Sequence, residues 1–201
     1  VREVSFKVAY ANIKRMKAMA WTDRSTRVFT DSVLSSAALG AEHSGLTKRE
    51  MDELRKAAAQ ATGRACIGVS VELKLFGEPP NYDHEFRIMS APVVRWGKEV
   101  YWASQPKGYA RPAGLLTGGQ LWEAARHVEN GAVVAGVPLE AVGNGLKLVV
   151  WKIPGMNTIT TCHHGKIDLT LGSPAMFKAI YHVEYDRVRC RRVMDTIQPK
   201  W

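Results

Sequence analysis

Three residues whose types could do chemistry stand side by side near the C-terminal end of the chain. They are Cys162, His163 and His164, in the stretch TCHHGKIDLTLGSP. A cysteine beside two histidines could ligate a metal, or could form a nucleophile with its base. A structural zinc site needs a second close pair of ligands, and the sequence contains no C-x-x-C. Adjacent residues of a strand point to opposite faces, so we expect neither a metal site nor a catalytic residue here.

Other catalytic patterns are also missing from the sequence. The glycines of GGQ (118–120) and GNG (143–145) lack the strand–loop–helix context and the Gly-Lys-Ser/Thr ending of a phosphate loop. No two aspartates are adjacent, although two-metal chemistry usually needs clustered carboxylates. His182 and Cys190 have a spacing that matches no standard metal motif. The sequence therefore predicts no phosphate loop, no two-metal site and no standard metal motif.

Charge is the strongest compositional feature. The chain has 201 residues and a formal net charge of +9, with 46% hydrophobic and 23% charged residues. This composition is typical of a globular protein of one domain or two small ones. A basic surplus of this size indicates a polyanionic partner, and nucleic acid is the first expectation. A globular domain that is merely basic is the alternative.

The cysteine content and hydropathy indicate a compartment. Cys66, Cys162 and Cys190 are odd in number and far apart, which argues against a disulfide framework and fits a reducing environment. The sequence has no run of 18 apolar residues, so we expect no membrane span and no membrane partner. An intracellular protein, nuclear or cytoplasmic, is the expectation.

The periodicity of the first half predicts helices. Apolar residues recur at helical spacing in residues 1–21 and again in residues 25–38. Thr47 with Glu50 forms a capping box for a third helix, which Gly63 would end. Ser70 is a cap for a short further helix, and the proline-rich stretch 77–83 is the best internal boundary.

The second half predicts more helix and a late hairpin. A helix restarts at Ser90–Pro92, because proline is tolerated in a first turn. Residues 158–171 alternate and are rich in threonine, which predicts a β-hairpin with Gly165 at positive φ. His163 and His164 then form its polar tip, so replacing both with alanine should change little. Ser173 and Pro174 open a last, basic helix whose predicted inner face is Met176, Phe177, Ile180, Tyr181 and Val183.

These elements predict a mainly α fold with one small β-hairpin, in the α+β class. The N-terminal half is a helical bundle, and the hairpin is followed by the basic C-terminal helix. We expect a boundary between residues 1–78, a helical region, and residues 79–201, which hold the hairpin near 158–171 and the last helix.

A family resemblance appears in residues 28–63. An apolar helix ends in AALGAE, a glycine pivot and a Thr cap follow, and the next helix holds LR and an alanine run. This order resembles the region that follows the palm in reverse transcriptases of non-LTR retroelements. The family's tyrosine before Gly40 is replaced by Leu39. PVVRWGKEVYWA and the stretch from Gly165 to Arg189 are also similar to later parts of that family, so the resemblance covers roughly residues 15–192.

The resemblance implies a thumb-like and linker region that grips a template–primer backbone, not a catalytic centre. The family's catalytic aspartates lie in the palm, with its Mg2+, and this chain has no such pair. We expect no cofactor in this chain, and whether it takes part in an enzyme depends on an upstream polymerase domain of the same polyprotein. The resemblance implies RNA or DNA as partner, bound by the basic residues near both ends: Lys14, Arg15, Lys17, Arg24, Arg27, Lys178, Arg187, Arg189, Arg191 and Arg192.

Two other functions stay open from the sequence. A basic structural or assembly subunit, without enzymatic activity, would pack against a protein partner and would need a large exposed apolar patch. A small Cys/His enzyme or metal protein would use the residues around Cys162.

Overall fold

The computed structural model describes residues 2–17, 25–38, 46–62, 68–78, 83–106, 114, 116–129, 138–155 and 157–198. Helices make up most of this part of the chain. In order, the elements are α1 (Arg2–Lys17), α2 (Ser25–Val28), the π-helical η1 (Phe29–Leu34), α3 (Ser35–Ala38), α5 (Lys48–Ala61), α6 (Val71–Phe76), α7 (His84–Ser104), α8 (Gly118–Glu129), α9 (Pro138–Leu148), β1 (Lys152–Gly155), β2 (Thr158–Thr161), β3 (Gly165–Asp168) and α10 (Pro174–Ile197).

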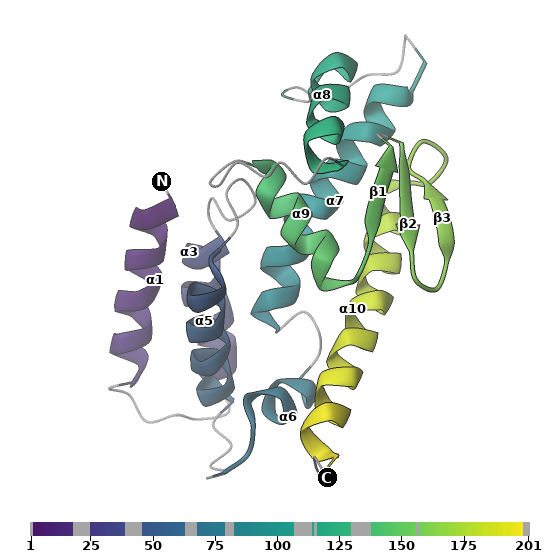
Figure 1. The fold of residues 1–201 in the computed structure, drawn as a ribbon. Helices are drawn as coiled ribbons and strands as arrows, with labels where there is room; N and C mark the ends of the chain where they lie inside the picture. The colour runs from purple at the N-terminus through teal and green to yellow at the C-terminus, as the bar shows by residue number, and fades with distance from the viewer. Residues whose placement is uncertain are drawn as a thin grey trace.

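The arrangement is a helical assembly with a small sheet at one side (Figure 1). Helices α1, α3 and α5 lie together at one side, α7 and α9 lie in the middle, and the sheet covers part of α10 at the other side. The predicted class, mainly α with a small antiparallel sheet and a C-terminal helix, is confirmed. The predicted boundary near residue 78 stays a prediction, although two core clusters divide the described residues near there and meet on α7.

The helix starts follow the predicted capping residues. The Thr47 hydroxyl accepts the Glu50 N–H, and the Glu50 carboxylate accepts the Thr47 N–H at 2.7 Å, so the capping box is complete. Ser70 caps α6 and Ser173 caps α10, where Pro174 occupies the first turn. Gly63 lies outside the described residues. Local side-chain hydrogen bonds therefore fix these helix starts in the way that the sequence indicates.

The predicted restart at Ser90–Pro92 is wrong. Helix α7 is continuous over 21 residues, with Pro92 buried in its interior. The helix begins instead at Asp83, whose side chain accepts the Glu85 N–H at 3.1 Å. Proline removes one backbone hydrogen bond from a helix interior. The residues around Pro92, including Phe86 and Val93, are buried, and the helix continues through the proline.

The sheet has one strand more than the predicted hairpin. Strands β2 and β3 form that hairpin, with Ile159 opposite Ile167 and Thr161 opposite Gly165. Strand β1 pairs antiparallel with β2, and the register shifts between Lys152 and Gly155. The four residues of β1 contain Pro154 and Gly155, which are depleted in strands, so composition does not indicate this edge strand.

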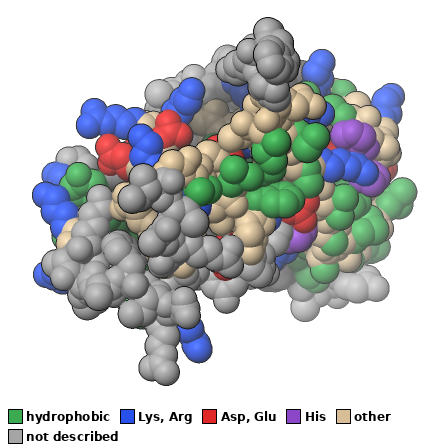
Figure 2. Space-filling view, turned by 90° about the horizontal axis from the view of Figure 1, so that it is seen from below, with side chains coloured by type: hydrophobic (Ala, Val, Ile, Leu, Met, Phe, Trp, Pro, Cys, Tyr) green, Lys and Arg blue, Asp and Glu red, His purple; other side chains and the backbone are tan. Residues whose placement is uncertain are grey.

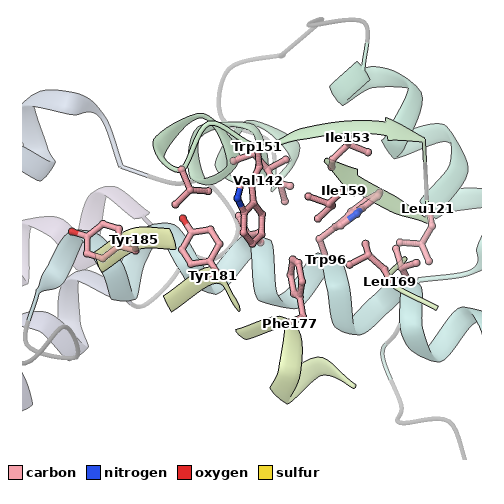
Figure 3. Close-up of a cluster of buried hydrophobic side chains, with 14 of the residues drawn as sticks. Trp96, Leu121, Val142, Trp151, Ile153, Ile159, Leu169, Phe177, Tyr181 and Tyr185 are labelled. Atoms are coloured by element: carbon pink, nitrogen blue, oxygen red, sulfur yellow. The ribbon is translucent and has the colours of Figure 1, made fainter. Parts of the chain in front are cut away.

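The second core cluster lies between the sheet, α7, α9 and α10 (Figure 3). Trp151 packs at its centre, with its ring centroid 5.7 Å from Phe177 and 5.3 Å from Tyr181. The Tyr181 hydroxyl donates to the Gly145 carbonyl at 2.8 Å. A Cβ atom at Gly145 would overlap the Met89 carbonyl, so this glycine allows α9 to approach α7 closely.

The predicted inner face of α10 is confirmed in part, because Phe177 and Tyr181 are buried and Ile180 packs against the second core cluster. Phe177, Tyr181 and Tyr185, spaced four residues apart, are buried as a line of aromatic rings. Met176 and Val183, which we expected to point inward, are each 47% exposed. The helix carries apolar residues on more than one face, and the larger aromatic side chains bury more area when they face the core.

Candidate nucleic-acid interface

The turn that connects β2 to β3 holds Cys162, His163 and His164. Gly165 follows the turn with φ of +69°, as predicted. The Thr161 hydroxyl donates to the Gly165 carbonyl at 3.2 Å and accepts the His164 N–H at 2.8 Å. The side chain of Thr161 therefore holds the backbone of the turn. The side chains of Cys162, His163 and His164 are exposed.

Both histidines of the turn lie against one carboxylate of α10. His163 Nδ1 is 2.9 Å from Glu184 Oε2, and His164 Nε2 is 3.1 Å from Glu184 Oε1. Arg187 Nη1 donates to Glu184 Oε1 at 2.7 Å. Glu184 is buried, whereas the two rings are about two-fifths exposed. The turn is thus fixed to α10 by its histidines, a contact across 20 residues that no sequence pattern indicates.

The thiol of the turn hydrogen-bonds to a backbone carbonyl, while the two neighbouring histidine rings contact Glu184. The Cys162 thiol donates to the Val150 carbonyl at 3.4 Å, and Val150 has a positive φ of 58°. Cys162 and Cys190 are free and exposed. Among the described residues, no group of three or more His, Cys, Asp or Glu side chains could hold a metal ion. The contact of Cys162 with the Val150 carbonyl therefore indicates a structural role in the turn.

A row of polar residues crosses the outer face of the sheet. Lys152 lies opposite Thr160, and Thr160 lies opposite Lys166, so the three side chains share one face. Ile159 is buried on the other face. Both lysines are exposed. Adjacent strands are about 4.8 Å apart, so the two lysine stems are roughly 10 Å apart, with a hydroxyl between them. We call Lys152, Thr160 and Lys166 the sheet row.

Two of the predicted binding arginines are used inside the protein. Arg189 is buried, and its Nη2 donates to the carbonyls of Leu75 at 2.6 Å and of Glu78 at 2.8 Å. Its Nε lies 3.7 Å from Asp83 Oδ2. Arg192 donates to both oxygens of Glu85. These guanidinium groups join α10 to α6 and α7, so we leave both out of the candidate interface.

Helix α5, which belongs to the first core cluster, also contacts Glu85, through Arg55. Arg55 of α5 donates to both oxygens of Glu72, at 3.0 and 2.6 Å, and its Nε lies 3.6 Å from Glu85 Oε2. The Tyr185 hydroxyl donates to Glu85 at 3.1 Å. We call this set the charge joint: Arg55, Glu72, Asp83, Glu85, Arg189 and Arg192.

Burial is the largest single influence on the pKa values of Asp83, Arg55 and Tyr185. It raises the pKa of Asp83, an effect that Arg55 opposes and Glu85 reinforces. It also raises the pKa of Tyr185 well above its ordinary value. For Arg55, burial lowers the pKa, but the hydrogen bonds to Glu72 and the charge of Glu85 outweigh it, so the pKa is raised. The guanidinium groups of Arg55 and Arg192, whose pKa values are raised, therefore stay charged, while the buried carboxyl of Asp83 holds its proton more tightly.

The other predicted residues that the structure describes are distributed over three helices, α1, α2 and α10. On α1, Lys14 and Arg15 are exposed, and the Lys14 ammonium lies 5.2 Å from the centre of the Tyr10 ring. Arg27 is exposed and lies 3.8 Å from Asp31. On α10, Lys178 and Arg191 are exposed, and Arg187 is partly exposed beside Glu184. The Lys17 side chain and Arg24 lie outside the described residues.

Charges of opposite sign are sorted between the interior and the surface. Within the described ranges, four acidic side chains are buried, namely Asp83, Glu85, Glu99 and Glu184. Only two basic side chains, Arg55 and Arg189, are buried there. Each buried carboxylate lies within 4 Å of an arginine nitrogen. Because Glu99 and Glu184 pair with the exposed Arg95 and Arg187, these two carboxylates offset surface cations, and the positive surface of the described chain rests on its other exposed lysines and arginines.

Comparison with models of known protein families, with curated proteins and with solved structures gave no match. No helix in the described part of the chain combines the length and the apolar character that crossing a membrane requires.

Proposed function

We propose that this chain binds nucleic acid through phosphate contacts, as a non-catalytic C-terminal portion of a reverse-transcriptase-like retroelement protein. The observation that carries the binding proposal is the set of exposed cations on α1, the sheet and α10. The fold buries more carboxylates than cations and leaves Lys14, Arg15, Lys152, Lys166, Lys178 and Arg191 exposed. Nucleic-acid binding that depends on phosphate charge needs such an unneutralised basic surface.

The sheet row is the part of this surface with the best-defined geometry. Its two lysines lie on the outer strands β1 and β3, and Thr160 of β2 places a hydroxyl between them. Lysine and threonine are common donors to phosphate oxygens, and such contacts position a backbone without reading its sequence. The proposed interface therefore adds Lys152 and Lys166 to the exposed cations of α1 and α10.

The retroelement part of the proposal has a separate basis. It rests on the resemblance of residues 28–63 and of the later stretches to the post-palm region of reverse transcriptases. A mostly helical fold is compatible with a thumb-like role. The reading frame upstream of Val1 tests it, because a palm with paired aspartates should be encoded there. An upstream frame without such a motif would leave the binding proposal standing and remove the retroelement one.

A salt titration tests the binding proposal. Anisotropy of a labelled primer–template duplex should show binding whose log K falls linearly with log salt. Lys152→Gln with Lys166→Gln should weaken binding about tenfold at low salt and reduce the salt slope by roughly two. The matched control is Lys48→Gln with Lys56→Gln, which removes two exposed lysines of α5. Binding independent of salt, or no tighter than that of a neutral protein, would refute the proposal.

A further inference from the structure

An exposed apolar stripe runs along the whole of α10, and the functional proposal does not use it. Met176, Val183 and Ile197 are 47, 47 and 58% exposed, and Met194 is 52% exposed. Cys190 is also exposed. Figure 2 shows the end of the molecule where α10 finishes, and hydrophobic side chains gather there over a continuous area. We call Met176, Val183, Cys190, Met194 and Ile197 the α10 seam.

The spacing of the seam is that of a coiled coil. Met176, Val183, Cys190 and Ile197 follow one another at intervals of seven residues. Ile180, Arg187 and Met194 occupy the intermediate positions, also seven apart, and Ile180 is partly buried against the second core cluster. The pattern extends over the 24 residues of α10, a length of about 36 Å at 1.5 Å per residue. A sustained seven-residue repeat on an exposed helix face is the pattern that pairs with a second helix.

We propose that α10 pairs with the α10 of a second copy of this chain, as a parallel, in-register coiled coil. In heptad terms, Met176, Val183, Cys190 and Ile197 are d positions, and Ile180, Arg187 and Met194 are a positions. The inference goes beyond nucleic-acid binding and does not depend on it.

Charge complementarity selects a second copy in parallel orientation. Asp186 lies at the g position on one edge of the seam, and Arg191 lies at the e position on the other edge, five residues later. In a parallel dimer, g of one helix meets the following e of its partner, so two Asp186–Arg191 pairs form. The Asp186 side chain is 41% exposed and Arg191 is exposed, so both can take part. An antiparallel pair would instead bring the e edges together and would leave Asp186 without the partner's Arg191.

The local structure around the seam is compatible with this pairing. Arg187 would be the single charged residue at an a position, where one polar residue specifies register at some cost in stability. Its guanidinium already donates to the buried Glu184, which neutralises it within its own chain. The turn of His163 and His164 lies beside the e edge of α10, and the partner would present the small Ala179 there.

Sedimentation equilibrium of the nuclease-treated full chain tests the pairing. The wild type should be a dimer whose dissociation constant rises at least tenfold in Val183→Glu. Met194→Glu, at an exposed a position, is the second variant if Val183→Glu disturbs the circular dichroism spectrum. Arg191→Glu should weaken the dimer severalfold, whereas Lys98→Glu, the same charge change on α7, should not. A monomer, or a dimer that tolerates both seam variants, would overturn the inference.

Cross-linking through Cys190 tests the orientation. In the parallel register each Cys190 faces its counterpart, whereas an antiparallel pair brings it near Val183. A variant with Cys66→Ser and Cys162→Ser leaves Cys190 as the sole thiol. Diamide, which accepts two electrons and two protons from the thiols, should give a covalent dimer that dithiothreitol reverses. A dimer in sedimentation that diamide leaves uncross-linked would contradict the parallel arrangement.

Discussion

Glu184 is the residue that gives the turn of Cys162, His163 and His164 its role. Three polar groups, from the two histidines and Arg187, gather on one buried carboxylate. A buried carboxylate needs partners, since desolvation without hydrogen bonds is costly. The histidines therefore have a structural function in this turn, and the expectation that they form an idle polar tip needs revision.

We now expect His163→Ala with His164→Ala to lower the free energy of unfolding by about 1 kcal/mol. Loss of partners at a buried acceptor costs about 1–3 kcal/mol, and the exposure of both rings places the effect at the lower end. Urea unfolding at neutral pH measures it. Lys166→Ala, in the strand next to the turn, is the control and should change stability little. Equal stabilities of the double variant and the wild type would show that Arg187 alone satisfies Glu184.

At the scale of the element, α9 contains two glycines with opposite requirements. A Cβ at Gly145 would overlap the Met89 carbonyl and a methyl group of Val93, whereas a Cβ at Gly143 would meet nothing within 4 Å. Alanine is the better helix former wherever space permits it. Replacement of glycine by alanine should therefore raise the stability of the protein at Gly143 and lower it at Gly145.

Gly143→Ala should stabilise the protein by about 0.5–1 kcal/mol, because it lowers the entropy lost when α9 forms. Gly145→Ala should destabilise it by about 1–3 kcal/mol, because α9 must move away from α7. Thermal and urea unfolding of both variants measure the two effects. Destabilisation by Gly143→Ala would mean that α9 does not tolerate a side chain on that face.

The sequence predicts the elements whose signals are local. Thr47, Ser70 and Ser173 cap helices as predicted, and Gly165 has its positive φ, because each depends on side chains a few residues away. Pro92 was misread as a helix start because the cap at Asp83 and the burial around the proline decide instead. Strand β1 exists through its pairing with β2, which its own four residues do not encode.

The candidate interface was predictable only as a surplus of charge. Arg189 and Arg192 look like surface cations in the sequence, yet their partners stand more than 100 positions earlier in the chain. Lys152 and Lys166 belong to one row only because the strand register aligns them through Thr160. The periodicity of α10 indicates which residues share a face of the helix. Which face is buried depends on the elements that pack against it, and the sequence of α10 does not encode this.

At the scale of the whole molecule, the charge joint holds the two core clusters together. Arg55 comes from α5, Asp83 and Glu85 from the start of α7, and Arg189 and Arg192 from α10. These elements belong to different clusters, so the joint couples their stabilities. Removing one partner from a buried ion pair is far more disruptive than losing a surface pair.

The pH dependence of stability should contain the titration of Asp83. Its pKa is raised by burial in the folded state, so its contribution to stability is fully present below the unfolded pKa, about 3.9, and is lost as pH rises through the folded pKa. Asp83→Asn keeps an oxygen for the Glu85 N–H but does not titrate. The free energy of unfolding of the wild type, relative to that of Asp83→Asn, should therefore fall as pH rises above about 4. A difference independent of pH in urea unfolding would contradict this.

The contact between Arg189 and the Leu75 carbonyl, near the end of α6, has a consequence for the order in which the chain folds. Helix α6 has only six residues, and an isolated helix of that length is not stable in water. The group that satisfies its end is made 114 residues later. We therefore expect α6 to become stable only after α10 has been synthesised and has folded. Pulsed hydrogen exchange should show the amides of α6 among the last to gain protection.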